Sequence, residues 1–356
     1  MTPRLAPTNP LLRGGIFALL AALAFGLTTP LIQRFGEGVG PIPSATLLYA
    51  GAALVSVDLL WKGKEREAPV RGVHVRRLLL VALVGAVIAP ICLTWGLQHT
   101  TATSASLLLN FEAIFTVVLA WLVYREPIGR RVVLALVVMG IGGGLLVLGS
   151  TAARSGFGWG TVAVMLATVG WAVDNTLTRP LADLNPTQVV RWKGALGAAV
   201  GVVLSLALRQ PFPRLPAMLA LLACGATGYG LSLRFYLLAQ RRIGAGRTGS
   251  IFALAPFVGV GAAWALGDRS GNLVTLLAGG LFGLGVYLHL TETHGHQHTH
   301  TPVEHEHVHR HDDGHHEHVH VPPVEGEHSH VHAHDRRTHA HAHAPDLHHR
   351  HEHEHA

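Results

Sequence analysis

Long apolar stretches alternate with short polar breaks along the first 290 residues of this chain. A helix that crosses a membrane needs about 20 mostly apolar residues. The breaks between the stretches carry charge, Pro or Gly, which are typical of loops. The pattern therefore predicts an all-α integral membrane protein with ten transmembrane helices. The predicted helices cover residues 15–33, 43–61, 77–97, 102–124, 132–149, 158–178, 187–208, 215–238, 245–267 and 272–290.

The composition agrees with a protein whose solvent is mostly lipid. Hydrophobic residues make up 49% of the chain and charged residues only 13%, about half of the roughly 25% found in soluble domains. The net charge of +6 combines a basic body with an acidic tail. We therefore attribute it to membrane topology and expect no nucleic-acid partner.

The distribution of Lys and Arg predicts the orientation of the chain. With ten helices, the N-terminus and the even-numbered loops hold 17 of these residues and the odd-numbered loops hold 5. Positive residues accumulate on the cytoplasmic side. We therefore expect both termini in the cytoplasm and the body in the cell (inner or plasma) membrane.

Several function classes lack their motifs in this sequence. The two cysteines, Cys92 and Cys224, lie in apolar runs and form neither a disulfide framework nor a zinc site. There is no G-x-x-x-x-G-K-[ST] loop for ATP and no set of nucleophile and base. We expect no enzyme activity and no required cofactor.

The body contains a weak copy of itself. A shift of 142 residues aligns Gln98 with Gln240, Phe115 with Phe257, and Glu126 with Asp268. Five helices repeated twice give an inverted repeat, which is common in secondary transporters. The predicted organisation is a cytoplasmic N-terminus, two five-helix repeats and a tail, over residues 1–14, 15–150, 151–291 and 292–356.

Three segments carry a resemblance to a known family. They read SASLLLNFEAIFTVVLAWLVYREPI (104–128), GWAVDNTLTRPL (170–181) and GAGRTGSIFALAPFVGVGAAWALGDRSG (244–271). They resemble the EamA family of the drug/metabolite transporter superfamily, in a subgroup with a histidine-rich tail. The resemblance implies a 5+5 inverted-repeat fold with cytoplasmic termini, and a carrier, usually an exporter, of small organic solutes.

Ionisable residues within apolar stretches are costly and mark candidate functional sites. Glu112 lies near the middle of the fourth predicted helix, close to Asn110. A carboxylate at that depth can exchange a proton as the site opens to either side, which is the requirement for proton coupling. The alternative is a structural acid paired with Arg234.

A second group of polar residues lies on the sixth and eighth predicted helices. Asp174 and Asn175 can bind substrate, or Asp174 can pair with Arg179. Arg234, with Tyr229 and Tyr236, can hold an anionic or zwitterionic substrate. Pro256 interrupts the ninth predicted helix and can free a backbone carbonyl near a binding site.

The tail is dominated by histidine: 24 of the 27 histidines lie at or after His294. Its many charges and lack of apolar periodicity predict disorder. Imidazoles in H-x-H spacing are ligands for Zn, Ni or Co, bound without fixed geometry. The predicted ligands are His294, His296, His298, His300, His305, His307, His309, His311, His339, His341 and His343.

These observations favour a secondary active carrier of a small organic metabolite, working by alternating access. The alternative functions are a transition-metal (Ni/Co/Zn) carrier and a metal-responsive membrane sensor. The expected partners are the lipid bilayer, a small-molecule substrate and metal ions held by the tail. Pairs of glycines in G-x-x-x-G spacing predict close helix packing, within the bundle or across a homodimer interface.

Overall fold

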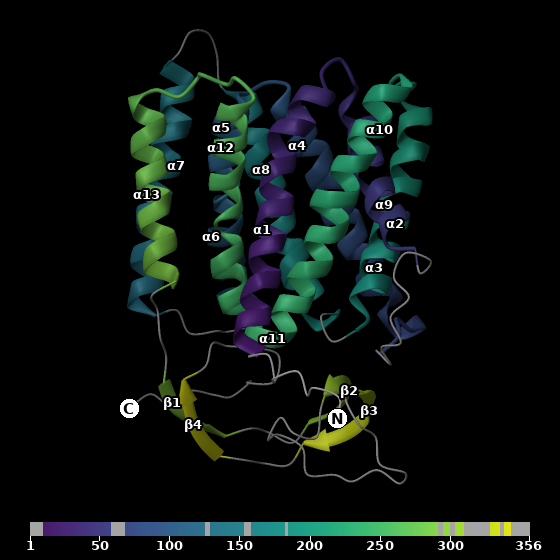
Figure 1. The fold of residues 1–356 in the computed structure, drawn as a ribbon, viewed down its shortest axis with the longest axis vertical. Helices are drawn as coiled ribbons and strands as arrows, with labels where there is room; N and C mark the ends of the chain where they lie inside the picture. The colour runs from purple at the N-terminus through teal and green to yellow at the C-terminus, as the bar shows by residue number, and fades with distance from the viewer. Residues whose placement is uncertain are drawn as a thin grey trace, which may run out of the picture.

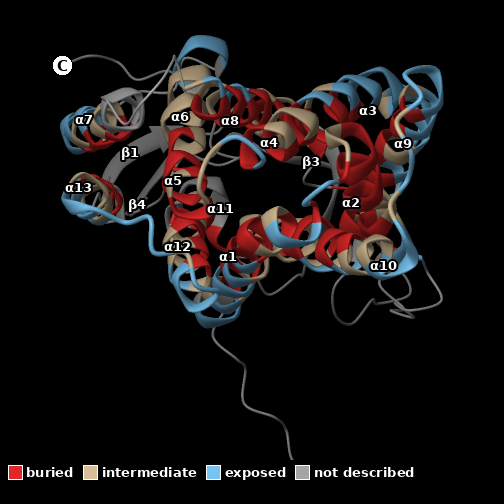
Figure 2. Cartoon of the chain, turned by 90° about the horizontal axis from the view of Figure 1, so that it is seen from above, coloured by how far each residue is buried: buried red, intermediate tan, exposed pale blue. Residues whose placement is uncertain are grey.

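The computed structural model of the chain is a bundle of helices that run roughly side by side (Figure 1). Seen along the bundle, buried residues face the centre and exposed residues face outward, and helices α7 and α13 stand together at one side (Figure 2). The structure describes residues 10–57, 68–124, 129–152, 158–181, 184–290, 295–299, 303–309, 328–334 and 338–342.

The helices follow the predicted apolar stretches closely. In chain order they are α1 (Pro10–Phe35), α2 (Pro41–Val55), η1 (Gly72–His74), α3 (Val75–Val81), η2 (Ala82–Ile88), α4 (Ala89–Leu97), α5 (Ala102–Leu108), α6 (Phe111–Tyr124), α7 (Arg130–Ala152), α8 (Trp159–Thr178), η3 (Arg179–Leu181), α9 (Pro186–Ala207), α10 (Leu215–Cys224), η4 (Gly225–Leu231), α11 (Ser232–Phe252), α12 (Ala255–Ala265) and α13 (Leu273–Leu290).

The predicted break between the eighth and ninth stretches, near residues 239–244, is wrong. Helix α11 continues to Phe252, and α12 starts at Ala255. Gly and Arg keep their backbone donors, so they do not force a helix to end. Pro256 does, because proline disfavours helical geometry in the residue before it and lacks an N–H. A similar turn at Leu109 and Asn110 separates α5 from α6.

Two of the long helices contain a π-helical segment at mid-length. Segment η2 covers Ala82–Ile88 and is followed directly by Pro90 in the first turn of α4. Pro90 cannot donate to the carbonyl of Ala86, so a wider turn relieves an otherwise unpaired carbonyl. Segment η4 covers Gly225–Leu231 and contains three glycines. Both segments change the direction of the side chains that follow them.

Glycines allow helices to approach closely in the half of the bundle that contains α2 and α9. An added Cβ at Gly194 would lie 2.8 Å from the nitrogen of Ala53, and one at Gly197 would lie 2.7 Å from the Cβ of Ala86. Gly197 and Gly201, which have G-x-x-x-G spacing, therefore pack within the bundle. A Cβ at Gly140 or Gly144 would meet nothing within 4 Å among the described residues.

The outer surface of the bundle is apolar, as expected for contact with lipid. Large apolar side chains are exposed on α7, α9 and α13, among them Val137, Val203 and Leu276. Among the described residues, five helices are long and apolar enough to cross a membrane, and three shorter apolar helices accompany them. Such an apolar surface is unfavourable in water, so the chain is an integral membrane protein.

The tail contains four short strands, so the prediction of disorder is wrong over those segments. They are β1 (Gly295–Thr299), β2 (Val303–His309), β3 (His328–His334) and β4 (Thr338–Ala342). Strand β1 pairs antiparallel with β4, and β2 pairs antiparallel with β3. The H-x-H pattern repeats every two residues, which is also the side-chain period of a strand.

A carboxylate links two loops at one end of the bundle. Asp268 lies in the loop between α12 and α13, and its Oδ2 accepts hydrogen bonds from the backbone N and the hydroxyl of Thr103, at 3.0 and 2.9 Å. Partial burial raises the pKa of Asp268, but hydrogen bonds from Ser270 and Thr103 outweigh it and hold the pKa below its usual value.

Replacing Asp268 with Ala should lower the free energy of unfolding by about 1–2 kcal/mol, because two Thr103 donors lose their acceptor. A carboxyl with a lowered pKa stabilises the fold at neutral pH and loses this effect only in strong acid. Thermal unfolding in detergent should show a constant difference from pH 7 down to about pH 4, which shrinks at lower pH.

Glu37→Gln, on an exposed loop, is the control. Equal stabilities at pH 7 would contradict the assignment.

Candidate functional site

A partly open cavity lies inside the bundle, among helices α1, α2, α6, α8, α9, η4 and α11. The residues that line it are Phe25, Tyr49, Glu112, Trp171, Asp174, Asn175, Lys193, Gly228, Tyr229, Ser232, Leu233, Tyr236 and Phe252. Acidic, basic, amide and aromatic side chains thus meet inside a membrane bundle.

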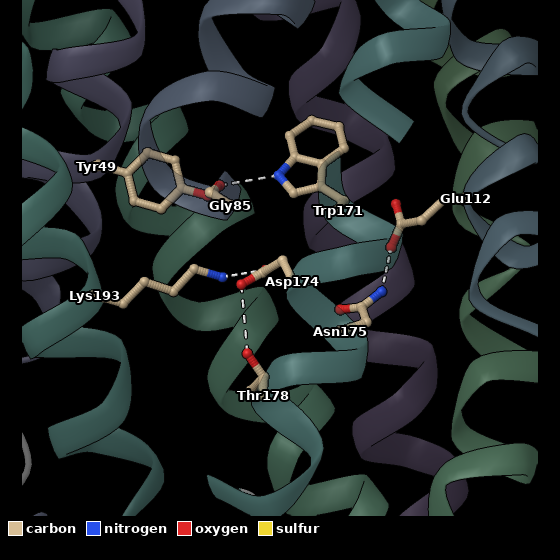
Figure 3. Close-up of polar contacts among 8 residues, drawn as sticks. All are labelled: Tyr49, Gly85, Glu112, Trp171, Asp174, Asn175, Thr178 and Lys193. Carbon is tan, nitrogen blue, oxygen red and sulfur yellow. Dashed lines mark hydrogen bonds and ion pairs between the residues drawn. The ribbon is translucent and has the colours of Figure 1, made fainter. Parts of the chain in front are cut away.

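An ion pair joins α8 and α9 at this cavity. The Nζ of Lys193 lies 2.5 Å from the Oδ2 of Asp174, and the two side chains are only 4% and 5% exposed. The hydroxyl of Thr178, one helical turn beyond Asp174, lies 3.4 Å from the other carboxylate oxygen (Figure 3). The alternative pairing of Asp174 with Arg179, expected from their closeness in sequence, is not the one that forms. Thr178, rather than Arg179, lies four residues along α8 on the face of Asp174.

A glycine makes room for this carboxylate. The Asp174 side chain packs on Gly85 in segment η2, where any Cβ would collide with the carboxylate atoms. The carbonyl oxygen of Gly85 accepts hydrogen bonds from the indole N–H of Trp171, at 3.1 Å, and from the hydroxyl of Tyr49 (Figure 3). The π-helical segment thus fixes two aromatic rings and one acid at the same position.

Glu112 lies on the other side of α8. Asn175, the residue after Asp174, donates from its Nδ2 to the Oε1 of Glu112 at 2.7 Å. Glu112 is half-buried in the first turn of α6, where the helix dipole favours negative charge. Figure 3 shows that Asp174 and Asn175 point to opposite sides of α8, one toward Lys193 and the other toward Glu112.

Aromatic rings form most of the remaining wall of the cavity. The ring of Phe25 lies 5.8 Å from those of Trp171 and Tyr229 and 5.5 Å from that of Phe252, between centroids. Tyr236 contacts Phe252 edge-on at 5.1 Å. These spacings are typical of packed aromatic pairs. The cavity therefore presents a few polar groups on an aromatic surface.

Five of the residues singled out from sequence line the cavity together: Glu112, Asp174, Asn175, Tyr229 and Tyr236. Three others do not. Arg234 donates from its Nε to the hydroxyl of Thr187 at 3.1 Å and does not line the cavity. Asn110 is 2% exposed and donates to the carbonyl of Leu107. Pro256 is buried at the start of α12.

Sequence reasoning missed Lys193 and most of the aromatic wall. Lys193 had a detectable signal, because a lysine within an apolar stretch needs a negative partner, and Asp174 is the acid of the preceding helix. Trp171 gave no such signal, since aromatic residues in membrane helices are usually core residues. Only the fold shows that Tyr49 and Phe25, from distant helices, meet at this cavity.

Metal ligands do not cluster in the described part of the chain, where no group of three His, Cys, Asp or Glu side chains is placed to hold an ion. Four of the predicted tail ligands, His294, His300, His311 and His343, lie outside the described residues. The other seven lie on strands β1, β2 and β4. The strand register places histidines opposite histidines, as with His307 and His330.

Removing one partner of the buried ion pair should destabilise the bundle strongly. We expect Lys193→Met to cost about 3–5 kcal/mol, because it leaves the Asp174 carboxylate buried without a counter-ion. Adding Asp174→Asn to Lys193→Met should restore most of the lost stability. The measurement is a double-mutant cycle of thermal unfolding in detergent. Additive effects of the two substitutions would show that the pair does not couple.

Comparison with known proteins places this architecture. The model of the EamA-like transporter family matches residues 12–148 and again residues 158–291. An uncharacterized transporter of Methanothermobacter thermautotrophicus is 28% identical over 268 residues, which cover 69% of this chain and 77% of that protein.

The fold is also represented among crystal structures. One solved protein chain superposes with a TM-score of 0.60 at 18% identity, covering 77% of this chain and 94% of that one. At that identity the likeness supports the fold alone. The family match covers most of the residues that form the bundle and all the helices that line the cavity. The chain belongs to the EamA-like transporter family.

Proposed function

We propose that this protein is a secondary active carrier that moves a small organic metabolite out of the cell by alternating access. The observation that supports this most directly is the cavity that is lined by Glu112, Asp174 and Lys193 within a membrane bundle. Ionisable groups at such a place are costly. A binding site for a polar solute gives them a use that a purely structural anchor does not.

We further propose that the bundle consists of ten membrane helices in a 5+5 inverted repeat. The family model matches two successive parts of the chain, in line with five-helix halves at 15–150 and 151–291. The π-helical segments give independent support, because η2 starts at Ala82 and η4 at Gly225, each within the third long helix of its half. Both segments contribute to the walls around the cavity. Gly85 of η2 packs against the Asp174 side chain, and Gly228 and Tyr229 of η4 line the cavity.

With ten helices both termini lie on one side of the membrane, and the excess of Lys and Arg in the same loops favours the cytoplasm. Alternating access then amounts to one half rocking against the other around the central cavity. The contact of Asp268 with Thr103 joins the two halves at one end of the bundle. It is suited to hold that end closed while the other end opens.

Glu112 is the proposed coupling residue. Its carboxylate accepts one hydrogen bond from an amide, and Lys193, the cation that acts on it, is bound to Asp174. A carboxylate in this position can take up a proton when the cavity is empty and release it when substrate arrives. Asp174 cannot serve equally well, since Lys193 already compensates its charge.

The tail supports a second proposal, that the protein binds divalent transition metals on its cytoplasmic side. Histidines in H-x-H spacing supply nitrogen ligands, and the strand register brings several of their backbone positions opposite one another. We propose that this binding buffers or senses metal. Transport of the metal itself has less support, because Glu112 and Asp174 are a small ligand set for a dehydrated divalent ion.

Glu112→Gln should abolish transport while leaving the fold intact, because the amide keeps the shape of the side chain but cannot exchange a proton. The measurement is the profile of solutes released by cells that express the intact chain, Glu112→Gln or the control Glu37→Gln. We expect at least one organic solute whose release falls to background in Glu112→Gln only. Unchanged release of every such solute would contradict the coupling role.

Ending the chain at Thr291 should remove metal binding and leave solute release unchanged. The measurement is total cellular Ni, Co and Zn in cells that express the intact chain, the shortened chain or Glu112→Gln. We expect metal content to follow the presence of the tail and to be independent of Glu112. If metal content changes with the intact protein and this change disappears in Glu112→Gln, the membrane site moves metal and the proposal for organic solutes is wrong.

A further inference from the structure

The charges that line the cavity do not balance. Three of the lining residues carry a carboxyl or an amino group: Glu112, Asp174 and Lys193. Lys193 is committed to Asp174 at 2.5 Å, so this pair is close to neutral as a unit. Glu112 accepts a hydrogen bond from the amide of Asn175, and its electrostatic interactions with Asp174 and Lys193 oppose one another. An ionised Glu112 therefore leaves the cavity with one negative charge in excess.

The hydrogen-bond donors of the cavity are largely occupied. The indole N–H of Trp171 and the hydroxyl of Tyr49 both donate to Gly85, and the hydroxyl of Ser232 donates to the carbonyl of Ala21. An anion would have to compete with Asp174 for Lys193 and would be repelled by Glu112. The described side chains are thus poorly arranged for an anionic ligand.

Aromatic faces supply the complementary feature. Six rings belong to the lining, from Phe25, Tyr49, Trp171, Tyr229, Tyr236 and Phe252. Because Trp171 and Tyr49 are both tethered to Gly85, the orientations of two of these rings are fixed before any ligand binds. Aromatic faces attract cations through their quadrupole, and the attraction is stronger where water is excluded.

We propose that the solute bound in this cavity is an organic monocation, with an ammonium group beside Glu112 and an apolar body against the aromatic wall. This inference rests on the proposed carrier function and names the substrate class of the same site. The Glu112 carboxylate and the aromatic faces together attract one positive charge. Lys193 does not oppose it, because Asp174 already neutralises the lysine. A zwitterion is disfavoured because its carboxylate must break the pair between Lys193 and Asp174.

The experiment compares four probes that share a phenyl body and differ in charge: 2-phenylethylamine, phenylalanine, 3-phenylpropanoate and 2-phenylethanol. Binding of each radiolabelled probe is measured on the purified full chain in lipid vesicles. We expect the amine to bind about tenfold more tightly than each of the others, since one charge-assisted contact with aromatic support has that size. The control Glu37→Gln should bind like the intact chain.

Two variants test the two parts of the site. Glu112→Gln should weaken binding of the amine about tenfold and leave that of 2-phenylethanol unchanged. Phe252→Leu keeps an apolar side chain but removes an aromatic face. It should weaken the amine severalfold and spare the alcohol. Loss of alcohol binding in either variant would show that the cavity had collapsed. Glu112→Asp and Phe252→Tyr, which keep the charge and the aromatic face, are then compared, and the inference is overturned if neither binds the amine more tightly than 2-phenylethanol.

The inference is overturned if phenylalanine or 3-phenylpropanoate binds more tightly than the amine, if no probe binds, or if Glu112→Gln binds the amine normally. Exchange of labelled probe across the same vesicles separates this failure from failure of the carrier proposal. Movement of phenylalanine or 3-phenylpropanoate without the amine leaves a carrier with another substrate class. Tight binding of the amine without movement leaves the cation site and removes the carrier function.

Discussion

The arrangement of the cavity depends on one buried ion pair, between Lys193 on α9 and Asp174 on α8. Two charges removed from water are tolerated only when each meets the other at close range with supporting hydrogen bonds. The neighbouring residues satisfy that condition: Thr178 lies beside the second carboxylate oxygen, and Gly85 leaves space for the acid. The close approach of η2 to α8, and with it the position of the Tyr49 and Trp171 rings, follows from housing this pair.

The acids on the two sides of α8 differ: Asp174 is neutralised within the protein, and Glu112 is not. Consecutive residues of a helix point about 100° apart, so Asp174 and Asn175 face different neighbours. Asp174 is held by a cation, whereas Asn175 only orients Glu112 through one hydrogen bond. If Lys193 were absent, the cavity would hold two uncompensated acids, and neither could be ionised cheaply. Among the described residues that line the cavity, the lysine thus leaves Glu112 as the carboxylate whose charge is open to compensation from outside the protein.

Apolar periodicity was sufficient to predict the helical bundle, and the two intramembrane acids singled out from sequence, Glu112 and Asp174, line its cavity. The partner of Asp174 was not predictable from proximity in sequence, because Arg179 is nearer along the chain than Lys193, yet Asp174 pairs with Lys193 and lies beside Thr178. The break near residues 239–244 was mispredicted because charge and glycine were treated as helix breakers. The break lies just before Pro256 instead. The aromatic wall depends on long-range packing of α1, α2 and η4, which no local pattern encodes.

A carrier that couples two fluxes by alternating access must reorient when its site is occupied and must not reorient when the site is empty. A bare charge in the cavity opposes that movement, because low-dielectric surroundings penalise it. The pair of Lys193 with Asp174 avoids the penalty in every state, since its charges cancel within the protein. Glu112 avoids it only when a proton or a cationic solute is present. On this view Lys193 leaves Glu112 as the carboxylate that must bind a proton or a cationic solute before the carrier can reorient. One residue is then enough to couple two fluxes.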